Sequence, residues 1–546
     1  MKKSSTIRVL ENKARKDDIN ALFQLAQYYE EGKDVEKDLE QAEVYFARVL
    51  TLFQAQSLQI SSLKLADFRG FESISIDFTN EGNSNLTVII GNNGAGKTSL
   101  LDAIKKSLSW ITKSILNQRD SGTGELIEVL DINNSSEVGY ASIVSKYTIV
   151  LGFSCTLLLS TAKRNDKNIR KGSYQDIKQL AEIYKLANFR DTQFNFPIMA
   201  YYSIERANEI TKKDTQSFNE ISEENGWGKF DGYDKALNGA ADFKLFFRWF
   251  KYLEDCNNAT VAEQNQKILT KVAKLQAELE GDLIKEMQRQ ARLDSKVNDF
   301  LISFKQKKQE ELIRLQEQIT PSPTNKIIES VIQVISKFIP EFKNLRIQRH
   351  PLAMLIDKNG ISLNVRQLSQ GEQSLLALVA DITRRLVLLN PSGDPLQGNG
   401  IVLIDEIDLH LHPKWQQTVI PGLLRAFPNV QFIITTHSPQ VLTTVPKECI
   451  RILSAGGVLN TQISALGEES RVTLEDVMDV GSRPEDSMSQ QLSEYLERIN
   501  RGEIDSEEIN QLRSKLENNY GEKHSQLRLA DMARNRFLAI RNQKGE

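Results

Sequence analysis

The sequence has few cysteines, few histidines and no long apolar run. Its three cysteines, Cys155, Cys256 and Cys449, lie far apart and fit no zinc-binding spacing, so we expect buried free thiols. The most apolar stretch, at residues 149–159, is too short to cross a bilayer. The basic start of the chain lacks the apolar core of a signal peptide. We therefore expect a cytoplasmic protein without a membrane segment.

An excess of charge of one sign is also missing. The chain has 69 basic and 72 acidic residues, which give a net charge of −3. Nucleic-acid binding would therefore need a local basic patch. The fractions of hydrophobic residues, 40%, and of charged residues, 26%, are typical of a globular protein with large cores. A length of 546 residues is too great for one domain and fits three or four.

Proline is absent between Pro197 and Pro321, and glycine is absent between Gly281 and Gly360. From residue 268 to residue 304, apolar residues recur mostly in steps of three and four, which indicates amphipathic helices. We expect these helices to fold back on each other as a short arm. Residues 325–338 predict another amphipathic helix.

The segment that organises the chain is GNNGAGKT, at residues 91–98. It follows an apolar run typical of a buried strand and precedes a sequence that favours a helix. In that context the pattern predicts a phosphate-binding loop, because glycine-rich backbone and a helix N-terminus can surround an anion. Lys97 is expected to reach the terminal phosphates of ATP, and Thr98 to ligate Mg²⁺. The predicted nucleotide-binding residues of this loop are Asn92, Asn93, Gly94, Gly96, Lys97, Thr98 and Ser99.

A second predicted buried strand ends in two carboxylates, Asp405 and Glu406. This is the Walker B pattern, in which Asp405 is expected to hold Mg²⁺ and Glu406 to polarise the attacking water. His437 follows a further predicted strand, and its position resembles that of the switch histidine of ABC ATPases, which contacts the γ-phosphate. The predicted catalytic residues are Glu406, His437 and Lys97.

The sequence LSQGEQ, at residues 368–373, precedes a predicted helix that ends near residue 389. Ser369 and Glu372 have the spacing of a capping box, so one interpretation is simply a well-capped helix. The segment also resembles the signature of ABC-type ATPases, whose helix N-terminus points at the γ-phosphate bound by a second subunit. The resemblance implies a homodimer with ATP sandwiched between two heads. The signature residues acting in trans would be Ser369, Gln370, Gly371 and Glu372.

Two arginines are further candidates. Arg69 lies between two predicted strands ahead of the phosphate-binding loop, as in RecF- and SMC-type ATPases, where such an arginine lies near the nucleotide. A surface charge in a hairpin is the alternative. Arg206 follows a predicted strand, at the place where sites of α/β proteins form. His410 and His412 could indicate a metal site, but residues 407–413 resemble the D-loop segment of RecF- and OLD-like ATPases.

Over about residues 57–460 the chain resembles the PtuA family, the ATPase subunits of Septu-type anti-phage systems, including those linked to retrons. The resemblance rests on residues 201–202, 243–253, 369–372 and 405–413. It implies an α/β fold, with an ABC-type, RecF- and SMC-like P-loop ATPase head and a helical arm. It also implies Mg²⁺ with ATP as cofactor and a separate HNH nuclease subunit similar to PtuB. In retrons, a reverse transcriptase and its RNA and DNA product would be further partners.

We predict five segments along the chain. They are a helical hairpin resembling one Sel1-like repeat (1–50), a head N-lobe with Walker A (57–210), an inserted loop and arm (211–324), a head C-lobe (325–460) and a helical tail (461–546). A single repeat cannot bury both its faces, so the hairpin should pack on the main body, on another copy or on a partner.

Two other functions stay open on the sequence. One is a RecF-like DNA-repair ATPase, and the other is a scaffold that binds ATP but hardly turns it over. The tail contains no Asp-x-Asp pair and little strand pattern. We therefore expect the chain itself to cut no nucleic acid.

Overall fold

The computed structural model of the chain describes residues 4–54, 57–79, 85–117, 123–137, 139–149, 153–163, 172–207, 227–280, 284, 301, 303–309, 311–312, 323–454, 457–461, 463–470, 473, 487–503, 506–521 and 524–544. The chain divides into two compact units, Met1–Gln462 and Ile463–Glu546. None of the described helices is long and apolar enough to cross a bilayer.

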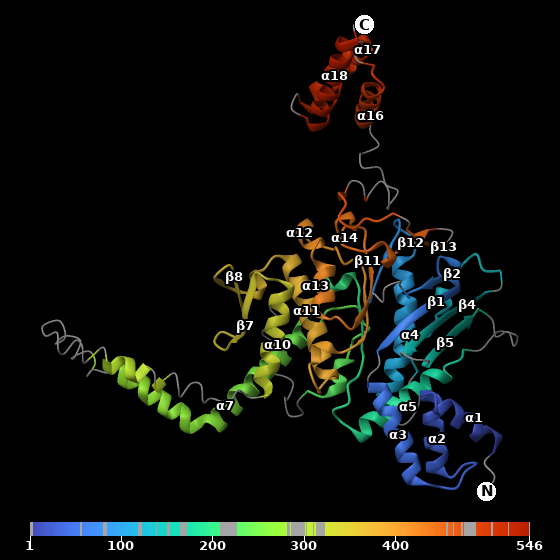
Figure 1. Cartoon of the computed structure of the whole chain (residues 1–546), viewed down its shortest axis with the longest axis vertical. Helices are drawn as coiled ribbons and strands as arrows, with labels where there is room; N and C mark the ends of the chain where they lie inside the picture. Colours follow the sequence, from blue (N-terminus) through green and yellow to red (C-terminus); the bar gives the residue numbers. More distant parts are fainter. Residues whose placement is uncertain are drawn as a thin grey trace. The chain divides into compact units, whose positions relative to one another are not determined.

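A six-stranded sheet forms the centre of the first unit, in the order β13-β12-β3-β11-β10-β6 (Figure 1). Its strands are β3 (Leu86–Ile90), β6 (Ile198–Tyr202), β10 (Gly400–Ile404), β11 (Val430–Thr435), β12 (Ile450–Ser454) and β13 (Gly457–Asn460). All neighbouring strands are parallel except β12 and β13. Four strands, β3, β6, β10 and β11, are buried along their whole length, as their continuous apolar sequences require. Because these strands are parallel, the loops that follow them meet at one edge.

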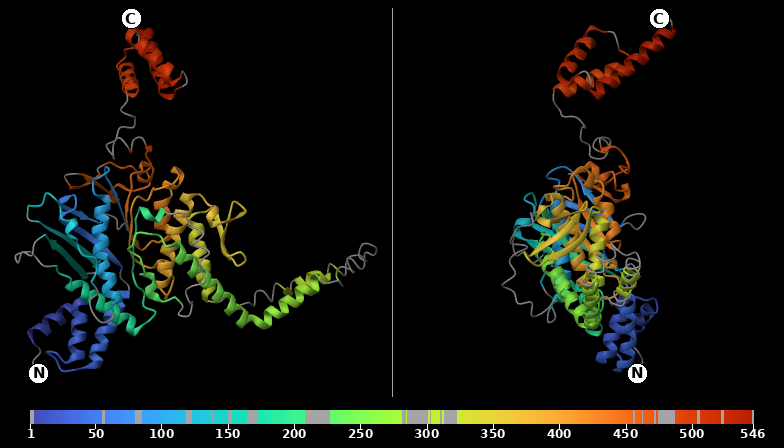
Figure 2. Two further views of the ribbon diagram at one scale, coloured as in Figure 1. Left: turned by 180° about the vertical axis from the view of Figure 1, so that it is seen from behind. Right: turned by 90° about the vertical axis from the view of Figure 1, so that its left-hand side faces the viewer.

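Helices cover both faces of this sheet, as Figures 1 and 2 show. On one side, α4 (Lys97–Leu116) packs against β6 and β11. On the other side, α11 (Gln370–Leu389) packs against α10 (Pro323–Phe338), which in turn contacts α13 (Val419–Ala426). The layered arrangement confirms the predicted α/β head. Shorter helical segments are α12 (Pro413–Gln416), α14 (Pro439–Leu442), η1 (Val129–Asp131), η2 (Ile204–Ala207), η4 (Lys229–Gly232), η5 (Val365–Gln367), η6 (Pro395–Gln397) and η7 (Lys447–Cys449).

A second, antiparallel sheet has the order β2-β1-β4-β5. Its strands are β1 (Leu58–Phe68), β2 (Phe71–Asp77), β4 (Tyr140–Ile149) and β5 (Phe153–Ala162), and α5 (Gln175–Arg190) packs on it. The polar sequence of residues 111–146 predicts irregular loops, and this expectation is wrong at both ends. Helix α4 continues to Leu116, and β4 already begins at Tyr140, because its inward residues alternate with outward polar ones.

A third sheet precedes the helix α11 and was not predicted. Its strands β7 (Phe342–Gln348), β8 (Ala353–Lys358) and β9 (Ile361–Asn364) form an antiparallel meander. Each strand is short, and its burial pattern is only partly alternating, which explains the weak sequence signal.

Three helices form the N-terminal region: α1 (Ser5–Ala14), α2 (Ile19–Glu31) and α3 (Leu39–Gln54). We expected only the second and third. The third helix packs on its own chain, since Phe53 contacts Tyr184 of α5 edge-on at a ring distance of 4.7 Å. Arg190 of α5 also pairs with Glu43 and lies 4.6 Å from the Phe46 ring centre. Among the three options for the hairpin, the structure therefore shows packing on the main body.

The arm begins with α7 (Phe243–Glu280), a helix of 38 residues. Lys308 forms an ion pair of 2.8 Å with Glu278 of α7, so a later segment runs back alongside this helix. This contact agrees with the expected fold-back. Much of the remaining arm lies outside the described residues, as do residues 211–226 of the loop expected at residues 211–241.

Within its described residues, the second unit contains three helices, α16 (Ser487–Asn500), α17 (Glu507–Tyr520) and α18 (Ser525–Lys544). They share a small core. The core residues are Leu492, Tyr495, Ile499, Ile509, Leu516, Leu527 and Ala530. The tail sequence predicts helices at residues 474–480, 489–499 and 527–540; α16 and α18 match the last two, whereas α17 was missed. A helix expected at residues 474–480 lies outside the described residues.

Candidate functional site

The predicted phosphate-binding loop connects β3 to α4. Gly94 has φ +82°, and a Cβ at this position would meet no atom within 4 Å. The loop is therefore open above this glycine, which is where a phosphate group would enter. The Phe71 ring packs where a Cβ of residue 96 would stand, so the hairpin of β1 and β2 lies directly against the loop.

Lys97 is buried at the centre of this loop. Its Nζ donates hydrogen bonds to the carbonyl oxygens of Gly91, at 2.8 Å, and Asn92, at 3.2 Å. Burial lowers the pKa of this lysine, while the nearby acidic residues oppose that effect. The loop curls around the ammonium group and places it at the helix N-terminus. Asn92, Asn93 and Ser99 line the same turn, and both asparagines are exposed.

The Walker B residues meet the phosphate-binding loop by direct hydrogen bonds. Asp405 is only 2% exposed, and its Oδ2 accepts a hydrogen bond from the Thr98 hydroxyl at 2.8 Å. Its Oδ1 accepts another from the hydroxyl of Thr435 at 2.5 Å. The same Thr435 oxygen accepts the backbone N–H of Glu406 at 2.8 Å. Sequence reasoning missed Thr435, although its place at the end of β11 next to β10 predicts contact with Asp405.

His437 stands two residues beyond β11, on the same edge of the sheet, and is partly exposed. The preceding residue, Thr436, donates its hydroxyl to Asp408 in the segment after Walker B. Ser438 caps α14 by accepting the N–H of Val441. The loop that carries His437 is thus fixed on both sides of the histidine.

Arg206 lies at this edge too, in η2 just beyond β6. It is 3% exposed, and its guanidinium donates to the carbonyl oxygens of Asp405 and Glu406. Glu406 has φ +47°, a left-handed conformation that non-glycine residues seldom adopt. Arg206 therefore contacts the main chain of both Walker B carboxylates.

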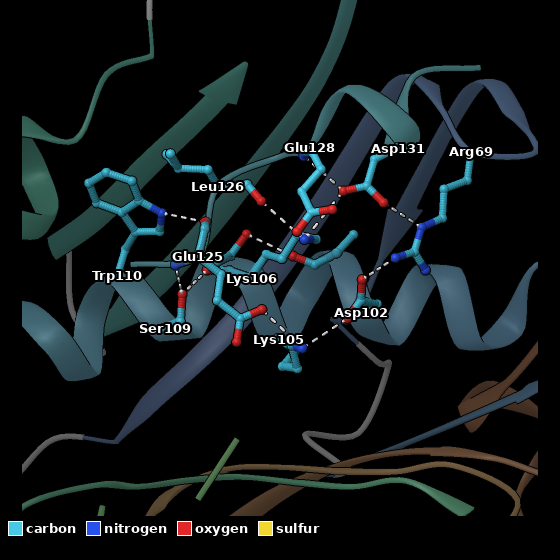
Figure 3. A network of polar contacts seen from close by, with 12 residues as sticks. Arg69, Asp102, Lys105, Lys106, Ser109, Trp110, Glu125, Leu126, Glu128 and Asp131 are labelled. Carbon is cyan, nitrogen blue, oxygen red and sulfur yellow. Dashed lines mark hydrogen bonds and ion pairs between the residues drawn. The ribbon is translucent and has the colours of Figure 1, made fainter. Parts of the chain in front are cut away.

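Arg69 is engaged by carboxylates (Figure 3). Its NH2 lies 2.6 Å from Asp102 of α4, and its Nε lies 2.8 Å from Asp131 of η1. Burial opposes the charge, but these partners raise the pKa of Arg69 above its ordinary value. Lys106 extends the network by contacting Asp131 at 3.3 Å, and Lys105 pairs with Asp102 at 3.2 Å. In this structure Arg69, in the turn between β1 and β2, ties this hairpin and η1 to α4, and its expected place near the nucleotide stays a prediction.

The predicted signature forms the start of α11. Ser369 caps the helix, and the Glu372 carboxylate accepts the N–H of Ser369 at 3.0 Å. The other Glu372 oxygen pairs with Lys358 of β8 at 2.6 Å. Ser369 and Gln370 remain exposed. A Cβ on Gly371 would lie 2.5 Å from the carbonyl oxygen of His410, so only glycine fits without moving the backbone.

The two histidines after Walker B do not form a metal site. His410 is exposed, and His412 caps a helix. The Nδ1 atom of His412 accepts the N–H of Lys414 at 3.3 Å and so caps α12. Within the described residues, no three histidine, cysteine, aspartate or glutamate side chains gather as metal ligands. A cation shared with nucleotide phosphates fits elsewhere. The Thr98 hydroxyl and the Asp405 carboxylate are hard oxygen ligands, and they already lie 2.8 Å apart.

The sequence matches a known family and several curated proteins. The AAA ATPase domain family matches residues 59–442. The chain is 36% identical to the retron Ec83 probable ATPase of Escherichia coli, over 95% of this chain and 94% of that protein. It is 34% identical to the retron Vc95 probable ATPase of Vibrio cholerae serotype O1 biovar El Tor, over 81% and 82% of the two chains. A segment of 75 residues is 44% identical to the Septu protein PtuA of Bacillus mycoides, covering 14% of this chain and 10% of PtuA.

The matched range contains the phosphate-binding loop, the signature, Walker B and His437. The two retron relatives extend the similarity over most of the chain. The chain therefore belongs to the AAA ATPase domain family, and over most of its length it is similar to two retron probable ATPases.

Proposed function

We propose that the chain binds ATP with Mg²⁺ at the phosphate-binding loop, hydrolyses it, and thereby controls a separate nuclease of an anti-phage defence complex. The hydrogen bond between Thr98 and Asp405 is the observation that carries the site. It joins the loop to Walker B although the two residues are 307 positions apart in the sequence.

The side chains divide the work of hydrolysis. The Lys97 ammonium would neutralise the terminal phosphates, because it is buried at the helix N-terminus where anions bind. Thr98 and Asp405 would hold Mg²⁺, which neutralises charge that develops on the phosphates. Glu406 would orient the attacking water, and His437 would contact the γ-phosphate.

The signature would act on a second copy of the chain. Ser369 and Gln370 are exposed at the start of a capped helix. A helix N-terminus attracts anionic groups. One phosphate-binding loop and one signature per chain form two identical composite sites in a two-fold dimer. ATP would then join the two heads, and its hydrolysis would release them.

The partner would be an HNH nuclease subunit, in a retron setting together with a reverse transcriptase and its RNA and DNA product. The similarity to the two retron ATPases and to PtuA supports this assignment. The chain itself is proposed to cut no nucleic acid. The purified chain, incubated with Mg²⁺ or Mn²⁺ and DNA or RNA, should leave both intact. Cleavage that persists through removal of all co-purifying proteins would contradict this part.

The test of the ATPase assignment is Glu406→Gln. This variant should bind a fluorescent ATP analogue like the wild type but release phosphate at least about 100-fold more slowly, because general-base catalysis is lost. The exposed Glu448 offers a matched control, since Glu448→Gln changes the same chemistry outside the site. Equal phosphate release by the wild type and Glu406→Gln would refute the assignment. A wild type without turnover would favour the scaffold reading.

A further inference from the structure

The Walker B turn has an unusual backbone. Glu406 is left-handed, with φ +47°. In a helical conformation of either hand, consecutive carbonyl groups point in nearly the same direction, whereas in a strand they alternate. The turn at Glu406 presents the carbonyl oxygens of residues 405 and 406 to one side of the chain, because one guanidinium reaches both. Arg206 lies on that side and donates to both oxygens.

The guanidinium of Arg206 suits this position because its planar fork carries several donors. Its NH1 also donates to the carbonyl oxygen of Ser203 at 2.9 Å, which fixes the fork to its own turn. Burial lowers the pKa of Arg206 to about 10, and the carboxylates of Asp405, Asp408 and Glu406 oppose that effect. The group therefore stays charged at neutral pH, and its donors remain available.

The other side of the turn is held by Thr435. Its hydroxyl oxygen accepts the N–H of Glu406, and its hydrogen goes to the carboxylate of Asp405. Arg206 thus holds the two carbonyl groups while Thr435 holds the N–H group. Together they fix the backbone of Glu406 and with it the direction of its Cα–Cβ bond.

The strand β6, which ends four residues before Arg206, is held by hydrogen bonds at its last residue, Tyr202. The carbonyl oxygen of Tyr202, the last residue of β6, accepts the N–H of Asp405 at 2.8 Å. The Tyr202 hydroxyl donates to Asp381 of α11 at 2.9 Å, and all three groups are buried. The strand β6, which leads to Arg206, is therefore fixed between Walker B and the signature helix.

We propose that Arg206 is a positioning residue for ATP hydrolysis. It holds the main chain of Asp405 and Glu406 so that the Glu406 carboxylate faces the attacking water, and it acts through this backbone rather than on ATP. The inference rests on the proposed ATPase function.

The experiment compares Arg206→Ala and Arg206→Lys with the wild type in the full chain. For both variants we expect ATP affinity within about threefold of the wild type and a kcat reduced about 10- to 100-fold, as for other residues that orient a reacting group. Lysine should not restore the rate, because one ammonium group does not reproduce the planar fork. Added guanidinium at millimolar concentration should partly restore the kcat of Arg206→Ala. Arg349→Ala is the matched control, since Arg349 pairs with Glu254 away from the site.

Two results would overturn the inference while leaving the ATPase assignment intact. One is an unchanged kcat in Arg206→Ala when Glu406→Gln is inactive. The other is loss of ATP binding together with a lowered melting temperature and no response to guanidinium, which would make Arg206 a general structural residue. If the wild type itself lacks turnover, the ATPase assignment fails first and the inference fails with it.

Discussion

The two halves of the proposed ATP site are built differently. In the half formed by the phosphate-binding loop and Walker B, functional side chains contact each other directly, as Thr98, Asp405 and Thr435 do. In the signature half, the bonds between Ser369 and Glu372 complete a helix cap, and Glu372 also pairs with Lys358. The first half is assembled within one chain, whereas the second is an exposed helix start. This difference is what a site completed by a second copy requires.

The two halves are joined through the interior by Asp381 of α11. This carboxylate pairs with Arg384 and Arg385, each at 2.8 Å, and accepts the Tyr202 hydroxyl. All four side chains are essentially without solvent exposure. The signature helix and the strand leading to Arg206 are therefore held together by a buried charge cluster. Breaking this cluster should lower the free energy of unfolding. Changes in either half of the site should instead lower ATP binding or ATP hydrolysis.

The largest effect is expected for Asp381→Asn. Removing the charge leaves two buried arginines without their anion, which should lower the free energy of unfolding by about 3–5 kcal/mol. Urea unfolding followed by tryptophan fluorescence measures this. All four tryptophans, at positions 110, 227, 249 and 415, lie in the first unit. A loss below about 1 kcal/mol would contradict the importance of the cluster.

The same cluster predicts a pH dependence. Burial opposes ionisation of Asp381, but Arg385 and Arg384 outweigh it, so its pKa in the folded chain is below the ordinary value. The resulting stability is present above the unfolded pKa of about 3.9 and is lost as the pH falls through the folded pKa. The difference in stability between the wild type and Asp381→Asn should therefore shrink on acidification below about pH 4. A constant difference down to pH 2 would argue against this account.

Lys97→Ala should weaken ATP binding about 100-fold, because charge-assisted hydrogen bonds to the phosphates contribute roughly 3 kcal/mol. Isothermal titration calorimetry measures the change. Lys105→Ala is the matched control on the same helix, since Lys105 pairs with Glu125 and Asp102 instead. If both variants bind ATP equally well, the loop is not the ATP site.

Ser369→Arg should separate the two halves. The added side chain blocks the approach of a second head, so turnover should fall about tenfold or more while ATP affinity stays unchanged. Ile361→Arg places the same residue on an exposed strand and should behave like the wild type. Full turnover in Ser369→Arg would show that the signature is only a helix cap.

The smallest effect is expected for Tyr202→Phe. The change removes one hydrogen bond to Asp381 and leaves both arginines in place, so the loss of stability should be about 1 kcal/mol. The same urea experiment applies. A loss as large as that of Asp381→Asn would mean that Tyr202, rather than the arginines, holds the carboxylate.

The sequence identified the candidate site where its residues are consecutive in the chain. The loop at residues 91–98 and the carboxylates that follow β10 are local patterns next to strongly apolar strands, and the structure places both at the same sheet. Contacts between distant residues gave no such signal. The hydrogen bonds of Thr435 to Asp405 and Glu406 depend on the order of the strands in the sheet. The ion pairs of Arg69 depend on a loop that no local sequence pattern predicts. The meander of β7, β8 and β9 was missed because its strands are short and partly exposed.

Arg206 shows the limit most clearly. Its place after a buried strand made it a candidate, but its role depends on the order of strands in the sheet, which puts β6 beside β10. That order brings the guanidinium to the two Walker B carbonyl groups. A sequence pattern can identify such a residue as a candidate but cannot predict which groups it contacts.

The most direct test of the account is the molar mass of Glu406→Gln by light scattering, with and without saturating ATP. Slow hydrolysis should trap ATP between two heads, so the variant should be larger by a factor of two with ATP. The double variant Ser369→Arg with Glu406→Gln should keep the same mass in both conditions. An unchanged mass of the single variant at saturating ATP would contradict the composite site.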